Sequence, residues 1–505
     1  MMRARSPTIG RVAGTLGFAG AYLLSSYLLL RPALTTALLG DDFEAPFANL
    51  YDSGVGLFRA LHYAWQTSFV MGDRSRVVSG FVGHAFAWFW LWFCAEFGVS
   101  LSTFYGATKF LTYVICAASV ATFWWLAARR TRRPIPWRVA LVLVSVALFG
   151  SVQLHGLWSN DPVQSLPLVG FAVTALGFAV LSMALWTIER PTWRRFALGA
   201  AVALLAVSYY ELNVGAVIGA FVIFAAEAWR LRGRVREVAR YAAGAAVFCG
   251  VPAAWLLFSR FTAVGDTYPG RQIGGNVGRA FVDGLIGSLP GAAWHLETKY
   301  VGGTPAIFVS AVIAALVAVA TLIWVVRRTP PASNGSAGPD GTRLASLAAA
   351  ASVAVFGVFA VALQTATILF GGQVAGIGYV YTFYAVSATA VALAFAAGAW
   401  WLIGRTTLRW KVAGGVAVLL FAAFLVVQGS FNARLRDVTN SELATNLAVY
   451  RTFAAGVPES QRCAAIDAWA QAPWPQYYKE DVVLGSDLGY LTYYGVPFCA
   501  DGPKP

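Results

Sequence analysis

Long apolar segments dominate this sequence and limit what the chain can fold into. Of its 505 residues, 58% are hydrophobic and only 12% are charged, which is far from the composition of a soluble globular protein. A helix needs about 20 apolar residues to cross the roughly 30 Å of hydrocarbon in a bilayer, and the segments have about that length. We therefore predict an all-α polytopic membrane protein.

The predicted crossings number about eleven. They are 10-31, 101-127, 137-155, 163-188, 194-210, 212-231, 241-262, 304-327, 344-370, 377-402 and 411-430. A further run, 81-97, contains Gly83-His84 and is dense in Trp and Phe, as helices at a membrane interface often are. We expect 81-97 to be an outer juxtamembrane helix, with a reentrant path as the alternative.

Basic residues occur in alternate loops, which predicts the orientation of the chain. They concentrate in 129-138, 190-195, 230-240, 327-343 and 405-411, whereas the intervening loops 155-161, 209-213 and 371-378 contain none. Basic loops stay in the cytoplasm, so we expect a cytoplasmic N-terminus and an extracytoplasmic C-terminus. The net charge of +14 then reflects topology and contact with membrane lipids, and we expect no nucleic-acid partner.

The chain divides into a transmembrane domain, 1-430, and a polar extracytoplasmic region, 431-505. The outer loops of the first domain are 40-100 and 263-303. Cys463 and Cys499 flank much of the polar region, and outside the cytoplasm a disulfide between them is favoured. A metal site would normally need more Cys or His ligands than this region offers.

The outer loop after the first apolar segment begins with the acidic pair Asp41-Asp42. Charges are costly inside hydrocarbon, so this pair must be solvated or bound. The two carboxylates can serve as a catalytic base, share a divalent cation, or simply cap a helix. In the same loop Arg74 and Arg76 can bind a phosphate in bidentate fashion or anchor the loop to lipid headgroups.

Further polar candidates lie at the predicted outer face. Glu211 joins two apolar runs, and an acid this close to hydrocarbon usually faces a cavity, although pairing with a loop arginine is an alternative. Arg271 and His295 lie in the loop 263-303 and can help to bind phosphate, although ordinary solvated-loop chemistry explains them equally well.

The first 130 residues resemble a known family. Gly80-Phe81-Val82-Gly83-His84, Trp90-Leu91-Trp92-Phe93, Phe97-Gly98-Val99-Ser100 and the 101-127 helix ending in Arg129-Arg130 are similar to a stretch of GT-C integral-membrane glycosyltransferases. The similar branch comprises the protein-mannosyl and lipid A aminoarabinose transferases. A shorter match, which includes Tyr381, opens the 377-402 helix. The Lys-Pro-Pro element of that branch is replaced here by Ser75-Arg76-Val77-Val78-Ser79.

This resemblance implies a GT-C-like fold and a glycosyltransferase that takes sugar from a polyprenyl-phosphate donor. The acceptor would be a glycan, lipid or protein on the extracytoplasmic side, and the catalytic base would be Asp41 or Asp42. We expect the inner membrane of a bacterium as the location. A polysaccharide polymerase or ligase and a lipid-linked-glycan transporter are the alternatives.

Overall fold

The computed structural model describes most of the chain. The described residues are 7–38, 41–70, 76–131, 134–155, 161, 163, 167–262, 274, 277–295, 304–328, 339–367, 380, 382–403, 408–473 and 479–500. Asp41, Asp42 and His295 have a described backbone, but their side chains lie outside the description.

Within these residues the structure is helical and contains no β-strand. The helices are α1 (Pro7–Leu34), α2 (Asp41–Ser53), α3 (Leu57–Trp65), α4 (Val77–Phe97), α5 (Leu101–Ala128), α6 (Trp137–Ser151), α7 (Gly170–Glu189), α8 (Trp193–Tyr209), α9 (Val214–Arg230), α10 (Val235–Phe261), α11 (Val277–Gly287), α12 (Pro305–Arg328), α13 (Pro339–Thr365), α15 (Phe383–Ile403), α16 (Leu408–Glu442), α17 (Ala444–Thr452), α18 (Glu459–Ala470) and α19 (Lys479–Tyr494). Short turns of other helix types are η1 (Gln66–Val70), η2 (Glu211–Asn213) and η4 (Ala292–His295).

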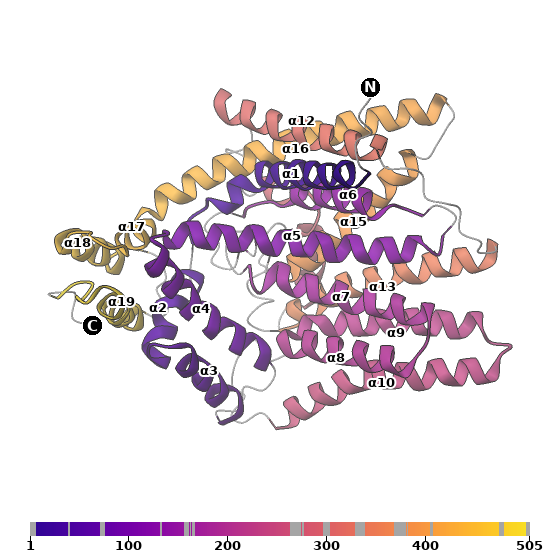
Figure 1. Cartoon of the computed structure of the whole chain (residues 1–505), viewed down its shortest axis with the longest axis horizontal. Coiled ribbons are helices and arrows are strands. Elements are labelled where there is room, and N and C mark those ends of the chain that lie inside the picture. The colour runs from indigo at the N-terminus through magenta and orange to yellow at the C-terminus, as the bar shows by residue number, and fades with distance from the viewer. Residues whose placement is uncertain are drawn as a thin grey trace.

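The long helices form a bundle with a separate layer at one end. Figure 1 shows α1, α5, α7, α9 and α12 running broadly alongside one another, while α2, α3, α4 and α17 to α19 gather at the left end of the view. The start of α1 lies away from the left end of the view, where α19 lies (Figure 1). We call the end that carries α2, α3 and α4 the polar end, and the opposite end the basic end.

Nine helices of the described part are long and apolar enough to cross a membrane. This confirms the predicted all-α class and fits a polytopic membrane protein. The set includes α4, which we predicted on the surface, and omits α1, α6 and α8, which match predicted crossings. In Figure 1 α4 lies obliquely at the polar end beside α2 and α3, rather than in the row of long helices. The exact number of crossings stays a prediction.

The shortest bundle helix, α6, lies in the core. Every residue from Val139 to Ser151 is buried, as expected for a helix that is apolar on all sides. Its 15 residues span only about 22 Å at 1.5 Å per residue. The predicted crossing 137-155 therefore ends in four non-helical residues, 152–155, which are also buried.

Ion pairs join three helix ends at the basic end. Arg129, which follows α5, lies 3.4 Å from Glu189 at the end of α7. Arg130 and Arg230 both bind the buried Glu227 near the end of α9. The ends of α5, α7 and α9 thus come together, as the alternation of basic loops predicts.

The C-terminal region continues directly from a bundle helix. The predicted boundary at residue 430 falls inside α16, which runs without a break from Leu408 to Glu442. The helix continues because Phe431 and Leu435 are buried in the main core. Beyond it, α17 to α19 form a small cap, in which the predicted disulfide between Cys463 and Cys499 is present.

The cap packs on α2 through two glycines of α19. A Cβ atom at Gly485 would lie 2.1 Å from the backbone oxygen of Phe47, and one at Gly489 would lie 2.9 Å from a methyl carbon of Leu50. Aromatic side chains complete the contact, since Phe43 stacks on Tyr450 with ring centroids 4.8 Å apart. The cap therefore determines where α2 lies.

Substitution of Gly485 tests this contact. Gly485→Ala should destabilise the protein by about 1–3 kcal/mol, because the added methyl group forces α19 away from α2. Thermal unfolding of the purified protein in detergent measures the effect. Gly414→Ala in α16 is the matched control, since a Cβ there meets nothing within 4 Å. Equal unfolding temperatures for both variants would contradict the close packing.

Two acids at the contact predict a pH dependence. Burial, and then the charge of Asp481, raise the pKa of Asp52, which also accepts a hydrogen bond from Tyr63 at 3.3 Å. A raised carboxyl pKa weakens the folded state above that pKa, and the penalty disappears below the unfolded value of about 3.9. Asp481→Asn should therefore stabilise the protein at pH 7, by about 0.5 kcal/mol or less because Asp52 is largely exposed.

Measuring the effect of Asp481→Asn on stability at acidic pH as well as at pH 7 provides the control. Near pH 3, below the ordinary carboxyl pKa of about 3.9, the stabilisation by Asp481→Asn should shrink, because Asp52 is then largely protonated in both proteins. Glu480→Gln changes the neighbouring exposed charge and should show no such dependence. Unfolding curves recorded at both pH values decide the point, and a pH-independent effect of Asp481→Asn would contradict it.

Candidate functional site

Two of the predicted site residues, Arg76 and Glu211, bind each other. Arg76 immediately precedes α4, and Glu211 begins η2, between α8 and α9. Nε of Arg76 donates to Oε2 of Glu211 at 2.8 Å, and Nη2 donates to Oε1, so the pairing is bidentate. Both side chains are about 30% exposed, which leaves the pair accessible from solvent. The structure therefore confirms the alternative prediction that Glu211 pairs with a loop arginine.

The aromatic ring of Tyr210 completes this arrangement. The guanidinium carbon of Arg76 lies 4.0 Å from the ring centroid, within the range of a cation–π interaction. Tyr210 is itself buried, so its ring forms a fixed surface under the cation. Arg76 is thus oriented by a carboxylate on its edge and a ring on its face.

Hydrogen bonds extend from Tyr210 to two further helices. The Tyr210 hydroxyl lies 3.5 Å from that of Thr382 and accepts from the Gln364 amide at 3.4 Å. Gln364 also accepts from the backbone N–H of Phe383 at 2.7 Å, which holds the start of α15 against the end of α13. The predicted residue Tyr381 lies next to Thr382 in sequence but outside the described residues.

Asp41 and Asp42 are the first two residues of α2. Side chains of three other helices hold the backbone that leads to them. Lys109 of α5 donates to the Ala33 carbonyl at 3.1 Å. The Asn440 side chain accepts from the Ala37 N–H at 2.6 Å, and Asn446 donates to the Leu38 carbonyl at 2.9 Å. The backbone is thus held by hydrogen bonds as far as Leu38, and Asp41 is the first residue of α2. The orientation of the two carboxylates lies outside the description.

A buried lysine supports this stretch of backbone. Lys109 is only 1% exposed and lies on α5, three residues after Gly106, whose missing side chain lets α5 approach the Leu34 carbonyl. Burying an ammonium is costly unless it is hydrogen-bonded or paired. The sequence contains a signal that we missed, since Lys109 is the only charged residue within the apolar segment 101-127.

Helix α4 connects the turn before α2 with the Arg76–Glu211 pair. Trp90 of α4 packs against Tyr450, the same ring on which Phe43 of α2 stacks. Arg76 lies fourteen residues earlier, about 21 Å away along the helix axis. Helix α4 therefore links the start of α2 to the Arg76–Glu211 pair. At the start of α4, Arg76 contacts η2 through Glu211.

Three other predicted residues are not tested by this structure. Arg74 and Arg271 lie outside the described residues, and so does the side chain of His295. The part of the loop 263-303 that is described is packed against the bundle. Ser288 bonds Ser387 at 2.6 Å, and Trp294 donates to Gln428 at 2.9 Å.

A second polar group occupies the non-helical residues after α6. Asn432 of α16 accepts from the Leu154 N–H at 2.9 Å and donates to the Val152 carbonyl at 2.6 Å. The buried side chain of Asp161 accepts from the His155 N–H at 2.6 Å and from the Val163 N–H at 2.8 Å. These bonds satisfy backbone groups, so we interpret Asp161 as structural.

The described residues contain no cluster of three or more His, Cys, Asp or Glu side chains that could hold a metal ion. A divalent cation shared by Asp41 and Asp42 is one of the alternatives for the acidic pair, and it stays a prediction because these two side chains lie outside the described residues.

A double-mutant cycle on Arg76 and Glu211 tests the pairing. Arg76→Gln and Glu211→Gln should each destabilise the protein by about 1–3 kcal/mol, because each leaves a half-buried charge without its partner. The double variant should lose less than the sum, with a coupling of about 1 kcal/mol measured by thermal unfolding. Arg234→Gln, which removes an exposed pairing with Glu237, is the control and should cost almost nothing.

The arrangement combines a bidentate arginine, a buried tyrosine and an acidic helix start at one end of a membrane bundle. Comparison with protein-family models, with curated proteins and with solved structures finds no match for this chain. The resemblance to GT-C glycosyltransferases therefore rests on the sequence motifs alone.

Proposed function

We propose that this protein is a membrane-embedded glycosyltransferase that uses a polyprenyl-phosphate-linked sugar as donor. The acceptor, a glycan, lipid or protein, would react at the polar end of the bundle, on the extracytoplasmic side of a bacterial inner membrane. The fold would be GT-C-like. The observation that carries this proposal is that the acidic start of α2 and the bidentate Arg76 are both held at that end by side chains of several helices.

Transfer of a sugar from a phosphodiester requires two functions. A base must take the proton of the acceptor hydroxyl, and Asp41 or Asp42 is the proposed base. The departing lipid phosphate carries its own negative charge, so no second acid is needed to protonate it. Adjacent carboxylates repel each other, and such repulsion can raise the pKa of one of them and suit that group to accepting a proton.

The leaving phosphate needs a cation, and Arg76 is the proposed ligand. Because Arg76 lies about 21 Å along α4 from Trp90, which packs beside the start of α2, the start of α4 would have to move toward α2 for the transfer step. In the structure the Arg76 guanidinium binds Glu211 in the bidentate manner that also suits a phosphate. A donor phosphate would therefore displace or join Glu211, while the Tyr210 ring keeps the guanidinium in place. Arg74, two residues earlier in the chain, is a second proposed phosphate ligand.

A polysaccharide polymerase or ligase is the second candidate. It is favoured by the packing of η4, which carries His295, against the bundle through the bond between Trp294 and Gln428. In that case Arg271 and His295 would contact the substrates. Arg271→Ala and His295→Ala would then abolish activity, whereas loss of the acidic pair would have little effect.

Neutralising the acidic pair tests the leading proposal. In membranes supplied with a panel of radiolabelled polyprenyl-phosphate sugars, Asp41→Asn with Asp42→Asn should lower transfer by about 10²- to 10⁴-fold, the usual contribution of a positioned base. Asp52→Asn, at the other end of α2, is the matched control and should keep most of the activity.

The outcomes separate the candidate functions. Full activity in both single variants, Asp41→Asn and Asp42→Asn, would contradict the proposed base. If no donor supports transfer although the protein is folded, the polymerase or ligase is favoured. Movement of lipid-linked glycan across proteoliposomes without any transfer reaction would instead establish the transporter.

A further inference from the structure

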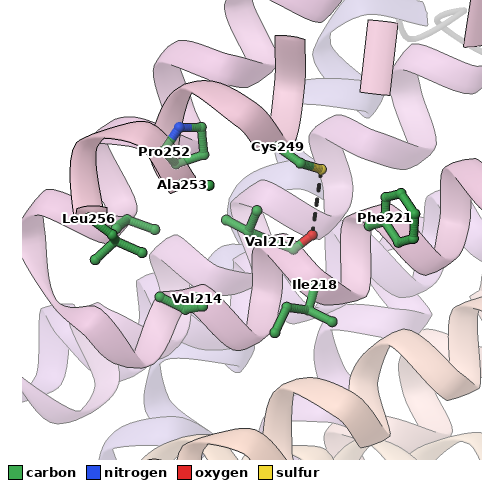
Figure 2. A pocket seen from close by; sticks show the side chains of 9 residues that line it. Val214, Val217, Ile218, Phe221, Cys249, Pro252, Ala253 and Leu256 are labelled. Carbon is green, nitrogen blue, oxygen red and sulfur yellow. Dashed lines mark hydrogen bonds between the residues drawn. The ribbon is translucent and has the colours of Figure 1, made fainter. Parts of the chain in front are cut away.

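An apolar groove runs along the outside of the bundle between α9 and α10. It consists of two cavities of about 240 and 450 Å³, and both are lined by Phe221 and Cys249. Figure 2 shows the first cavity, with Val214, Ile218 and Phe221 on one side and Pro252 on the other. The second cavity continues along the same two helices to Ala228 and Tyr241.

The groove exists because the two helices present side chains of different size. The lining residues of α10 are mostly small, and they include Ala242, Ala246, Gly250 and Ala253. On α9, Phe221 is 55% exposed and forms a ridge. A Cβ atom at Gly250 would meet nothing within 4 Å, so the floor of the groove is open.

The groove has the dimensions and surface of a site for a hydrocarbon chain. From Val214 to Ala228 the α9 wall extends about 21 Å, at 1.5 Å per residue. The lining side chains are apolar apart from the hydroxyl of Tyr241 and the thiol of Cys249, and the thiol is directed to the Val217 carbonyl at 3.7 Å (Figure 2). A polar ligand would find almost no partner in it.

Charge at the basic end of the groove indicates the headgroup. Residues 227–240, which begin at the last turn of α9, contain five arginines and two glutamates, a net charge of +3. Arg230 and Arg234 pair with the glutamates. Among the described residues Arg232, Arg236 and Arg240 form no ion pair, and all three are exposed.

Of these three arginines, Arg232 and Arg240 lie nearest to lining residues in sequence, since Arg240 immediately precedes Tyr241. Arg232 follows the lining residue Ala228 by four positions, and its guanidinium carbon lies 5.1 Å from the ring of Trp229. Trp229 is 64% exposed, as aromatic residues at a membrane interface often are. Basic clusters at this level attract anionic lipid headgroups.

We propose that the groove between α9 and α10 binds an anionic phospholipid. One acyl chain lies against Phe221, Ala246 and Gly250, and the phosphodiester headgroup contacts Arg232, with Arg236 and Arg240 adding to the local field. A second copy of this chain does not suit the groove, because it would bring an equally charged arginine cluster to the same membrane level. The inference depends on membrane insertion but not on the proposed glycosyltransferase activity.

Lipid retention by the purified full-length protein tests the site. The detergent-solubilised protein is titrated with phosphatidylglycerol or with phosphatidylcholine of identical acyl chains, and bound lipid is counted by native mass spectrometry. Phosphatidylglycerol should be retained at least tenfold more strongly. Combined Arg232→Gln, Arg236→Gln and Arg240→Gln should remove that preference, whereas Arg327→Gln with Arg328→Gln at the end of α12 should not.

Filling the groove with a larger side chain is the second test of the proposed lipid site. Ala246→Phe should reduce phosphatidylglycerol retention at least tenfold, while Ala243→Phe, an exposed α10 position outside the lining, should leave it unchanged. Ala246→Leu repeats the test if the larger side chain prevents folding. Equal retention of the two lipids by the wild type, or full retention by the filled groove, would overturn the proposal. So would a change from dimer to monomer in Ala246→Phe without loss of lipid.

Discussion

The requirement that every buried backbone group be hydrogen-bonded determines where this bundle can be interrupted. In hydrocarbon no water is present to satisfy an N–H or C=O group, so a helix can end only where another part of the protein supplies a partner. Amide side chains do this repeatedly here. Asn432 bonds the Val152 carbonyl and the Leu154 N–H in the break after α6, Gln364 binds the start of α15, and Asn213 donates to the Ala206 carbonyl near the end of α8. An amide is suited to this task because it offers a donor and an acceptor.

Two of these breaks come together beneath the Arg76–Glu211 pair. The end of α8 supplies Tyr210 and Glu211, and the start of α15 supplies Thr382, which lies within hydrogen-bond reach of Tyr210. Polar groups that satisfy the backbone therefore also provide the surface on which α4 rests. Because the pair is about 30% exposed, its attraction is weaker than that of a fully buried pair, and a phosphate can compete for the arginine. The same residues can therefore support the fold and take part in the proposed phosphate site.

Features that depend on composition and local pattern could be predicted from the sequence. The apolar segments predict the helical class, the basic loops predict that the ends of α5, α7 and α9 lie at one end of the bundle, and two cysteines in a polar region predict the disulfide. Helix ends inside the core were harder to predict from the sequence. The segment 137-155 is predicted as one crossing, and the bonds of Asn432, 280 positions from Val152, show why the helix stops at Ser151.

The candidate site shows the same limit. Glu211 and Arg76 could each be singled out as charges near hydrocarbon, but their pairing spans 135 positions and leaves no local signal. The role of Lys109 depends on its contact with the Ala33 carbonyl, which no periodicity encodes. The continuation of α16 to Glu442 depends on burial of Phe431 and Leu435 by other helices, which a boundary drawn from composition cannot include.

The two ends of α9 connect the proposed site with the proposed lipid. Glu211 lies three residues before Val214, where the groove begins, and Arg232 follows the last lining residue of the same helix. Only 28% of the most apolar part of α10 is buried in the protein, so lipid must cover much of its surface. A phospholipid in the groove would fill the space beside α9 and oppose its displacement. The helix that carries the partner of Arg76 at one end is then supported by the membrane along its length.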